Sequence, residues 1–332
     1  MLKTNLAKII VTLISIFAIA FGIYFYTQNL KPENKLIQSS LSSRKIKLGY
    51  LPLSPSTVAF VAKEKGFFQK NNVDVELIEM STTNQTAEGV INGDLDLNYY
   101  TSSVATLNAN AKTPNKFKIY SVSQNNSGNF DSLYVKKDSP IQSIQDLAGK
   151  KIGTFTGNSP STHLKAFLKK NSILTDGIEF VQLPFGNQIQ ALEVGSIDTL
   201  LAYEPINTTL ALNTEYRRIQ ESILAGKDNP NAVVSVNTIN SEFVTKFPAE
   251  AKNVIKAIDE AQEYSRNNPS EARQILGKYV KLTPEVLNNI YIWQYSKSTE
   301  IDVVKTQKYF DYMVELGEIK QKVNAEELIY KP

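Results

Sequence analysis

Residues 93–100 read GDLDLNYY and residues 195–205 read GSIDTLLAYEP, and both stretches begin with the same short pattern. In each, a glycine that can end a helix precedes an aspartate and a run of residues typical of a strand. An earlier basic and apolar segment accompanies each stretch, KIKLGY at residues 45–50 and KKIGTF at residues 150–155. This shared order at similar spacing predicts two lobes of one design.

Strands and helices alternate on both sides of these stretches. Alternation of this kind predicts mostly parallel sheets covered by helices on both faces. The fold class is therefore α/β, with two doubly wound lobes and a ligand cleft between them. We expect strands at residues 45–50, 73–80, 95–100, 117–123, 151–155, 178–183, 197–203 and 232–239, and helices at residues 57–70, 84–91, 103–112, 162–171 and 187–194.

Two polar segments flank the second series of strands and helices. They are QNNSGNF at residues 124–130 and GKDNPN at residues 226–231. They predict that the chain crosses from one lobe to the other and later returns. We assign residues 44–124 and 230–332 to lobe I and residues 125–229 to lobe II. Helices expected at residues 249–267, 270–279, 284–292 and 302–316 would wrap lobe I.

The N-terminus predicts export. Lys3 and Lys8 precede residues 9–26, which are 18 residues without a charge. This run is longer than the ~7–15 residues of a usual signal core, and at ~1.5 Å per residue it can span a bilayer. Residues 1–26 are thus a signal peptide or signal anchor, with an uncleaved anchor favoured, and residues 27–43 are a polar linker. The bulk of the chain is expected in the periplasm or at the extracytoplasmic face of the cell membrane.

Composition excludes several classes of function. Net charge is +3, from 36 basic and 33 acidic residues, which argues against a nucleic-acid partner. Cysteine is absent and His163 is the single histidine, so thiolate catalysis, a lipidated N-terminal cysteine and multi-histidine metal sites are excluded. Nucleotide-binding and serine-hydrolase motifs are absent. We therefore expect no enzymatic activity, no catalytic residue, no metal and no cofactor.

In open α/β sheets, ligands bind beyond the carboxyl ends of the strands. Here those ends lead into six loops, and two such sheets facing each other would form a cleft between lobes. The loops span residues 51–56, 81–83, 101–103, 156–162, 184–187 and 204–205.

The sharpest local feature is TGNSPSTH at residues 156–163, which places hydroxyls at the start of a helix. Such a position suits an anion or polar oxygen, although serine and threonine also cap helices without binding a ligand. His163 follows on the first turn and could contact ligand or serve only structure. Glu204 ends an apolar strand, where it could accept a hydrogen bond from the ligand or from its own loop.

Tyrosines flank the same strand ends. Tyr99 and Tyr100 are neighbours in one strand, so they cannot both face one side of the sheet. Core packing is the default expectation for Tyr99, Tyr100 and Tyr203, although one of them could contact the ligand. No arginine lies in the six loops, so a bidentate clamp for a carboxylate is not expected.

Several segments together resemble the substrate-binding proteins of ABC importers, in the nitrate/sulfonate/taurine-type family that includes aminopyrimidine (thiamine-precursor) binders. They are LGYLPLSPSTVAFVAKEKGFFQKNNVDVELIEM, INGDLDLNYYTSSVATLNA, LYVKKDSPIQSIQDLAGKKIGTFTGNSPSTHLKAFL, ALEVGSIDTLLAYEP and FVTKFPAEAKNVIKAIDEA. The resemblance implies a type II periplasmic-binding fold whose lobes close about a hinge. With the loops above, it makes these residues the candidate ligand contacts: Ser54, Ser56, Thr101, Ser102, Thr156, Gly157, Asn158, Ser159, His163, Tyr203 and Glu204.

The function implied by this resemblance is an exported solute receptor. It would capture a small polar or anionic organic molecule, such as a sulfonate, taurine or nitrate, and deliver it to an ABC permease and its ATPase. An aminopyrimidine-binding protein and a membrane-anchored ligand sensor are the alternatives. The loop LPLSPS at residues 51–56 lies where the family has a glycine-rich loop, so the resemblance leaves the identity of the ligand open.

Overall fold

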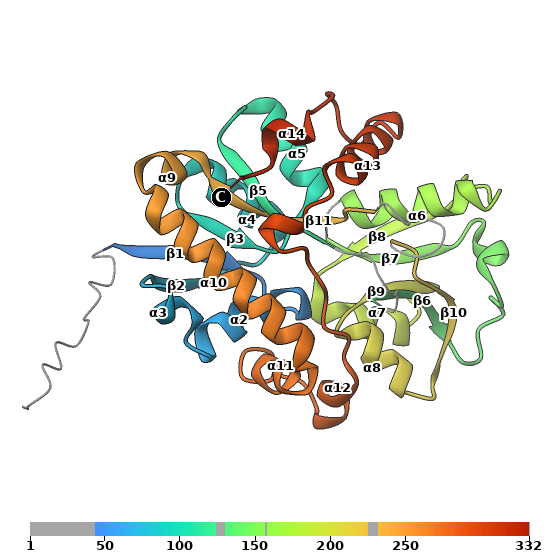
Figure 1. Ribbon diagram of the computed structural model, residues 1–332. Coiled ribbons are helices and arrows are strands. Elements are labelled where there is room, and N and C mark those ends of the chain that lie inside the picture. The colour runs from blue at the N-terminus through green and yellow to red at the C-terminus, as the bar shows by residue number, and fades with distance from the viewer. Residues whose placement is uncertain (1–43, 124–129, 157, 225–231, 332) are drawn as a thin grey trace, which may run out of the picture. The chain divides into compact units, whose positions relative to one another are not determined.

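Two β-sheets organise the chain, and each contains the strands of one repeat (Figure 1). The computed structural model describes residues 44–123, 130–156, 158–224 and 232–331, with only the backbone at residues 158 and 159. The first sheet has the order β2-β1-β3-β11-β4 with β5 paired to β11, and the second has the order β10-β6-β9-β7-β8. We call the first sheet with its helices lobe I and the second lobe II.

The strands of lobe I are β1 (Lys45–Tyr50), β2 (Asp74–Glu79), β3 (Leu97–Tyr99), β4 (Thr101–Ser102), β5 (Phe117–Val122) and β11 (Ser235–Asn240). Those of lobe II are β6 (Asp131–Lys136), β7 (Lys151–Phe155), β8 (Glu179–Leu183), β9 (Thr199–Tyr203) and β10 (Tyr216–Glu221). In each sheet the repeated strands run parallel, and the strand that follows a crossing from the other lobe, β6 or β11, is antiparallel. The orders β2-β1-β3-β11 and β8-β7-β9-β6 match, which confirms the two-lobed α/β fold.

The helices before the second crossing are α2 (Thr57–Glu64), α3 (Phe67–Lys70), α4 (Thr83–Asn92), α5 (Ser103–Lys112), α6 (Asn158–Lys170), α7 (Gln188–Glu193) and α8 (Ile206–Leu212). Those after it are α9 (Ser241–Lys246), α10 (Pro248–Asn267), α11 (Pro269–Leu276), α12 (Pro284–Asn289), α13 (Val303–Glu315) and α14 (Ala325–Leu328). Short 3₁₀ turns lie at Ser54–Ser56, Ile144–Leu147, Phe185–Asn187 and Ser298–Glu300.

In each repeat, an aspartate just before the third strand is hydrogen-bonded to the first strand. The Lys47 N–H donates to Asp96 Oδ2 at 2.9 Å, and the Lys151 N–H donates to Asp198 Oδ2 at 2.7 Å. In return, the aspartate N–H groups donate to the carbonyls of Lys47 and Lys151 at 3.0 and 2.9 Å. The repeated aspartate therefore joins the first strand to the start of the third through reciprocal hydrogen bonds.

The glycine in each first strand makes room for the residue before that aspartate. A Cβ at Gly49 would lie 2.4 Å from Leu95 Cδ1, and one at Gly153 would lie 2.4 Å from Ile197 Cδ1. The equivalent segments are thus KLG at residues 47–49 and KIG at residues 151–153. This register corrects the pairing of KIKLGY with KKIGTF by one residue.

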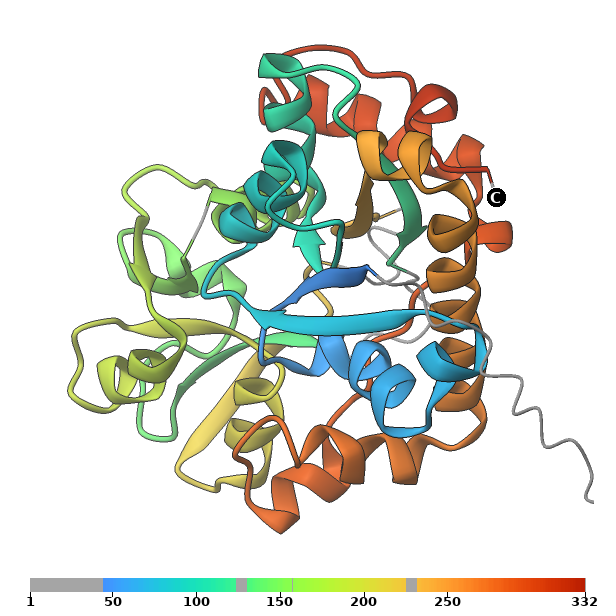
Figure 2. The ribbon, with the colours of Figure 1, turned by 90° about the vertical axis from the view of Figure 1, so that its left-hand side faces the viewer.

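The C-terminal helices cover lobe I, as expected. The long helix α10 runs across its face against α2 and α3, and the Tyr330 N–H donates to the Ile119 carbonyl in β5 at 2.8 Å (Figure 1). In contrast, α12 leaves lobe I and contacts α8 of lobe II, where the orange and yellow helices meet in Figure 2. The tail therefore also joins the two lobes.

Several sequence expectations need correction. The strands β6 and β10 and the helices α8 and α9 were not expected. The charged pattern of β10 (YRRIQE) obscures its periodicity, and α8 and α9 have only 7 and 6 residues, too few for a clear helical period. By contrast, the expected end of the helix in residues 57–70 near Gly66 is confirmed: α2 ends at Glu64, and Gly66 has a φ of 72° before α3 begins. The helix expected at residues 284–292 ends at Asn289.

Residues 1–26 and 27–43, expected to form the signal or anchor and the linker, lie outside the described residues, as do the proposed lobe boundaries at 124/125 and 229/230. Within the part of the chain that the structure describes, no helix combines the length and apolar character needed to cross a membrane.

We predict that Gly153→Ala lowers the free energy of unfolding by ~1–3 kcal/mol, because the added methyl group overpacks a filled core. Ile197→Val removes the clashing Cδ1 and should restore part of the loss in the double variant. Gly186→Ala is the matched control, since a Cβ there meets nothing within 4 Å. Chemical denaturation measures all four proteins, and an unchanged Gly153→Ala would contradict the close approach.

Candidate functional site

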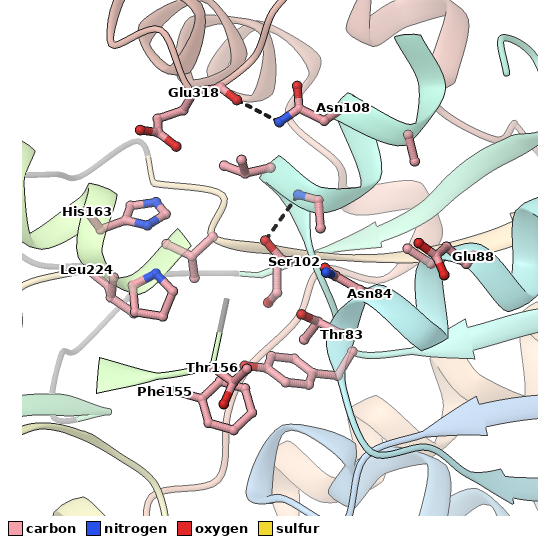
Figure 3. Close-up of a pocket in the computed structure, with 18 of the residues that line it drawn as sticks. Thr83, Asn84, Glu88, Ser102, Asn108, Phe155, Thr156, His163, Leu224 and Glu318 are labelled. Atoms are coloured by element: carbon pink, nitrogen blue, oxygen red, sulfur yellow. Dashed lines mark hydrogen bonds between the residues drawn. The ribbon is translucent and has the colours of Figure 1, made fainter. Parts of the chain in front are cut away.

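A cavity of about 660 Å³ lies between the two sheets, at the carboxyl ends of their parallel strands. Each of the six loops predicted from the sequence supplies a lining residue. From lobe I these are Leu53, Thr83 and Ser102, and from lobe II they are Thr156, Phe185 and Glu204. Figure 3 shows His163 and Leu224 on one side of this cavity and Thr83 and Asn84 on the other.

The structure separates the candidate ligand contacts into three groups. Ser102, Thr156, His163, Tyr203 and Glu204 line the cavity. Ser54, Ser56 and Thr101 are buried beside it and do not line it. Gly157 lies outside the described residues, and the side chains of Asn158 and Ser159 do too, although both residues belong to α6.

Three helices begin at the cavity. Helix α4 starts after its N-cap Thr82, and Thr83 and Asn84 of its first turn line the cavity. Helix α5 starts after Ser102, whose hydroxyl accepts from the Ala105 N–H at 3.3 Å. Helix α6 starts beside Thr156. Helix N-termini carry partial positive charge and free N–H groups, so the cavity offers favourable electrostatics to an anion without an arginine.

Aromatic side chains form much of the wall. Among the described residues, six Phe, Tyr and Trp rings line the cavity besides the imidazole of His163: Tyr100, Phe130, Phe155, Phe185, Tyr203 and Trp293. Sequence reasoning did not select Phe130, Phe155, Phe185 or Trp293. Phe155 and Phe185 lie at or just after the ends of expected strands. Both would have been selected if apolar residues at strand ends had been considered together with polar ones. Trp293 carries no such signal, because its segment comes from the far end of the chain.

The rim holds the charged residues. Glu88 and Lys112 come from α4 and α5, and Glu318 and Lys320 come from the segment after α13. Asn108 on α5 fixes that segment, since its Nδ2 donates to the Glu318 carbonyl at 2.6 Å and its Oδ1 accepts from the Lys320 N–H at 3.2 Å (Figure 3). The rim therefore carries both signs of charge.

The Glu204 carboxylate is held by its own surroundings. It accepts from Asn207 Nδ2 at 3.2 Å, from the Thr208 N–H at 3.2 Å and from Thr208 Oγ1 at 2.8 Å. The Tyr291 N–H donates to it as well. Burial raises its pKa to about 7, and these hydrogen bonds only partly oppose the rise.

Tyr291 links the two lobes behind the cavity. While its N–H donates to Glu204 of lobe II, its carbonyl accepts from Ser54 Oγ of lobe I at 2.6 Å. Two candidate ligand contacts, Ser54 and Glu204, thus bind the backbone of the same residue from opposite lobes.

His163 links the lobes at another point. Its Nε2 is hydrogen-bonded to the Tyr309 hydroxyl, so α6 of lobe II is joined to α13 of lobe I. Both side chains are buried. The crossing segments are joined by Asp131, whose carboxylate accepts from the Ile223 N–H at 2.8 Å and whose pKa burial raises to about 7. Among the residues that the structure describes, no cluster of three His, Cys, Asp or Glu side chains could hold a metal ion.

Two sheets of matching order around one cavity form the two-lobed fold of periplasmic binding proteins, and known proteins share it. The chain belongs to the family described as NMT1/THI5 like, which matches residues 55–272. A Bacillus subtilis (strain 168) protein named "Putative aliphatic sulfonates-binding protein" is 23% identical over 281 residues, which covers 81% of each chain.

Solved structures share the fold. The periplasmic aliphatic sulphonate binding protein SsuA from Escherichia coli has a TM-score of 0.70 at 19% identity, over 87% of this chain and 98% of its own. The periplasmic nitrate-binding protein NrtA from Synechocystis PCC 6803 has a TM-score of 0.66 at 16% identity, over 86% and 84%. Both of these neighbours are binding proteins by name, and the likeness shows that this chain has their fold.

We predict that the stability of the protein decreases as the pH rises from 5 to 7. Glu204 and Asp131 have ordinary pKa values of 4.5 and 3.8 that folding raises to about 7, so the folded state binds more protons in this range. In Glu204→Gln, the fall in unfolding free energy between these pH values should be smaller by about 2 kcal/mol.

Denaturation at pH 5, 6 and 7 measures this slope. The exposed Glu215→Gln in lobe II is the matched control and should leave the slope as it is in the parent. An identical slope in Glu204→Gln would show that this carboxyl does not titrate between these limits.

Proposed function

We propose that this protein is an extracytoplasmic receptor that binds a small organic anion between its lobes and delivers it to an ABC permease and its ATPase. The observation that carries the proposal is the cavity itself, into which six strand ends and three helix N-termini of two matched lobes converge. A binding site divided between lobes suits capture by hinge closure. The sulfonate-binding name of the Bacillus subtilis relative supports the anionic class.

The walls argue for an organic anion over a bare inorganic one. Nitrate has no apolar surface, whereas six aromatic rings and side chains such as Leu53 and Val234 line this cavity. Burying an apolar body against them would contribute ~25 cal/mol per Å². The anionic group would then lie at the helix N-termini, and the rest of the ligand against the rings.

An aminopyrimidine is the second candidate, favoured by the same rings. Such a ligand would need an acceptor for its amino group. Glu204 is the buried carboxylate on the lining, and four donors already converge on it. The anion therefore fits better.

A thermal-shift screen of the full chain tests the ligand class. Sulfonates, taurine, nitrate, amino acids and aminopyrimidines are offered at equal concentration, and a sulfonate should raise the melting temperature. At 100 times its dissociation constant a ligand stabilises the folded state by about 2.7 kcal/mol. A response to aminopyrimidines alone would favour the second candidate, and catalytic turnover of the hit would contradict a receptor.

Residues 9–26 would tether the receptor to the membrane by their uncharged run, with residues 27–43 as the spacer. We expect the exported protein to stay with membranes after a carbonate wash and to keep its N-terminal residues. Intact mass and fractionation measure this, with a salt wash as the control for peripheral attachment. Release by carbonate, or a mature chain beginning after residue 26, would contradict the anchor.

A further inference from the structure

Tyr100 has an unusual backbone conformation. It lies between β3 and β4 with φ at 76°, in the left-handed region that a bulky side chain seldom adopts. Its N–H donates to Oδ1 of Asn237 at 2.7 Å, and Asn237 is fully buried in β11. A tertiary hydrogen bond thus supports a local conformation that is unfavourable for a tyrosine.

The conformation decides where the ring goes. The preceding Tyr99 is fully buried in lobe I, and its hydroxyl donates to Gln262 Oε1 at 2.9 Å. Tyr100 lines the cavity and is only partly buried. A residue needed for the turn alone would be glycine or asparagine, since both accept positive φ more readily. Tyrosine at this position therefore points to a use for its ring.

Two further rings come from lobe II. Phe155 is the last residue of β7 and Phe185 follows the end of β8, and their ring centroids lie 6.1 Å apart at an interplanar angle of 76°. Both are partly exposed and both line the cavity. Figure 3 shows Phe155 projecting into the cavity below Thr83 and Ser102 of lobe I. Each lobe thus offers aromatic faces to the space between them.

Two buried donors lie deeper. Tyr203 Oη and Trp293 Nε1 have no hydrogen-bond partner among the described residues, and both side chains line the cavity. Phe130 lies between them, with centroid distances of 5.6 Å to Tyr203 and 3.9 Å to Trp293. Buried donors without acceptors are unfavourable, so this arrangement suits a ligand that brings acceptor atoms.

We propose that the receptor selects a planar aromatic anion, whose ring binds between Tyr100 of lobe I and Phe155 and Phe185 of lobe II. Tyr100 is the specificity-determining residue. Offset or edge-on contacts between rings add to the burial of apolar area, and a saturated ring of the same size lacks this contribution. The inference rests on the proposed function and narrows its class of ligand.

Calorimetric titration of the full chain with benzenesulfonate and cyclohexanesulfonate tests the inference, because the two differ in planarity and unsaturation and share the anionic group. The parent protein should bind benzenesulfonate about tenfold more tightly, as ~1.4 kcal/mol of ring contact implies. Tyr100→Gly should reduce this ratio to about two. Tyr100→Phe keeps the ring and should keep the ratio.

Tyr100→Gly is chosen because glycine favours the observed φ, so its melting temperature should equal or exceed that of the parent. Equal affinity for both sulfonates in the parent, or a ratio unchanged in Tyr100→Gly, would overturn the aromatic selectivity while leaving the organic-anion receptor intact. Failure of both sulfonates to bind the parent would instead contradict the proposed class of ligand, and this inference with it.

Discussion

A carboxylate immediately before the third strand holds each lobe together. Asp96 and Asp198 each accept a hydrogen bond from the first strand of their repeat and return one through their own N–H. Because the first strand also pairs with the second, this bond fixes three parallel strands in register. The positions of their carboxyl ends, and so of the six loops, depend on it. Gly49 and Gly153 allow this approach by leaving room for Leu95 and Ile197.

The cavity combines two kinds of surface that serve different parts of a ligand. Helix N-termini supply positive potential without a buried cation, which avoids the desolvation penalty of an arginine or lysine. Aromatic side chains supply apolar area. The buried acid on the lining, Glu204, is committed to Asn207, Thr208 and Tyr291, so it shapes the cavity as a structural group.

The segment around Tyr291 adds a connection between lobes besides the two crossings. Ser54 and Glu204 bind the backbone of Tyr291 from opposite lobes, Trp293 packs on Phe130, and α12 contacts α8. His163 and Tyr309 add a further bond between α6 and α13. Motion of the lobes must therefore involve the C-terminal tail, which reaches lobe II as well as covering lobe I.

Much of the architecture could be predicted from the sequence, because it follows from local periodicity and a repeated motif. GDLD and GSID located equivalent strand ends, and the strand-end rule located the loops that line the cavity. Tyr99 and Tyr100 have different surroundings, as expected, but Tyr100 lies outside β3 with a positive φ, so strand alternation does not account for the direction of its ring. The antiparallel strand β10 escaped prediction because its charged residues hide its period.

The tertiary structure alone decided what each polar group does. Ser54 and Glu204 stand in the expected loops, but their partner is Tyr291, a residue far away in sequence whose approach no local pattern encodes. The positive φ of Tyr100 depends in the same way on Asn237 from a strand that returns after the second lobe. Local sequence determines which elements form and where their ends point. Contacts between distant segments determine which polar side chains form hydrogen bonds within the protein and which side chains face the ligand cavity.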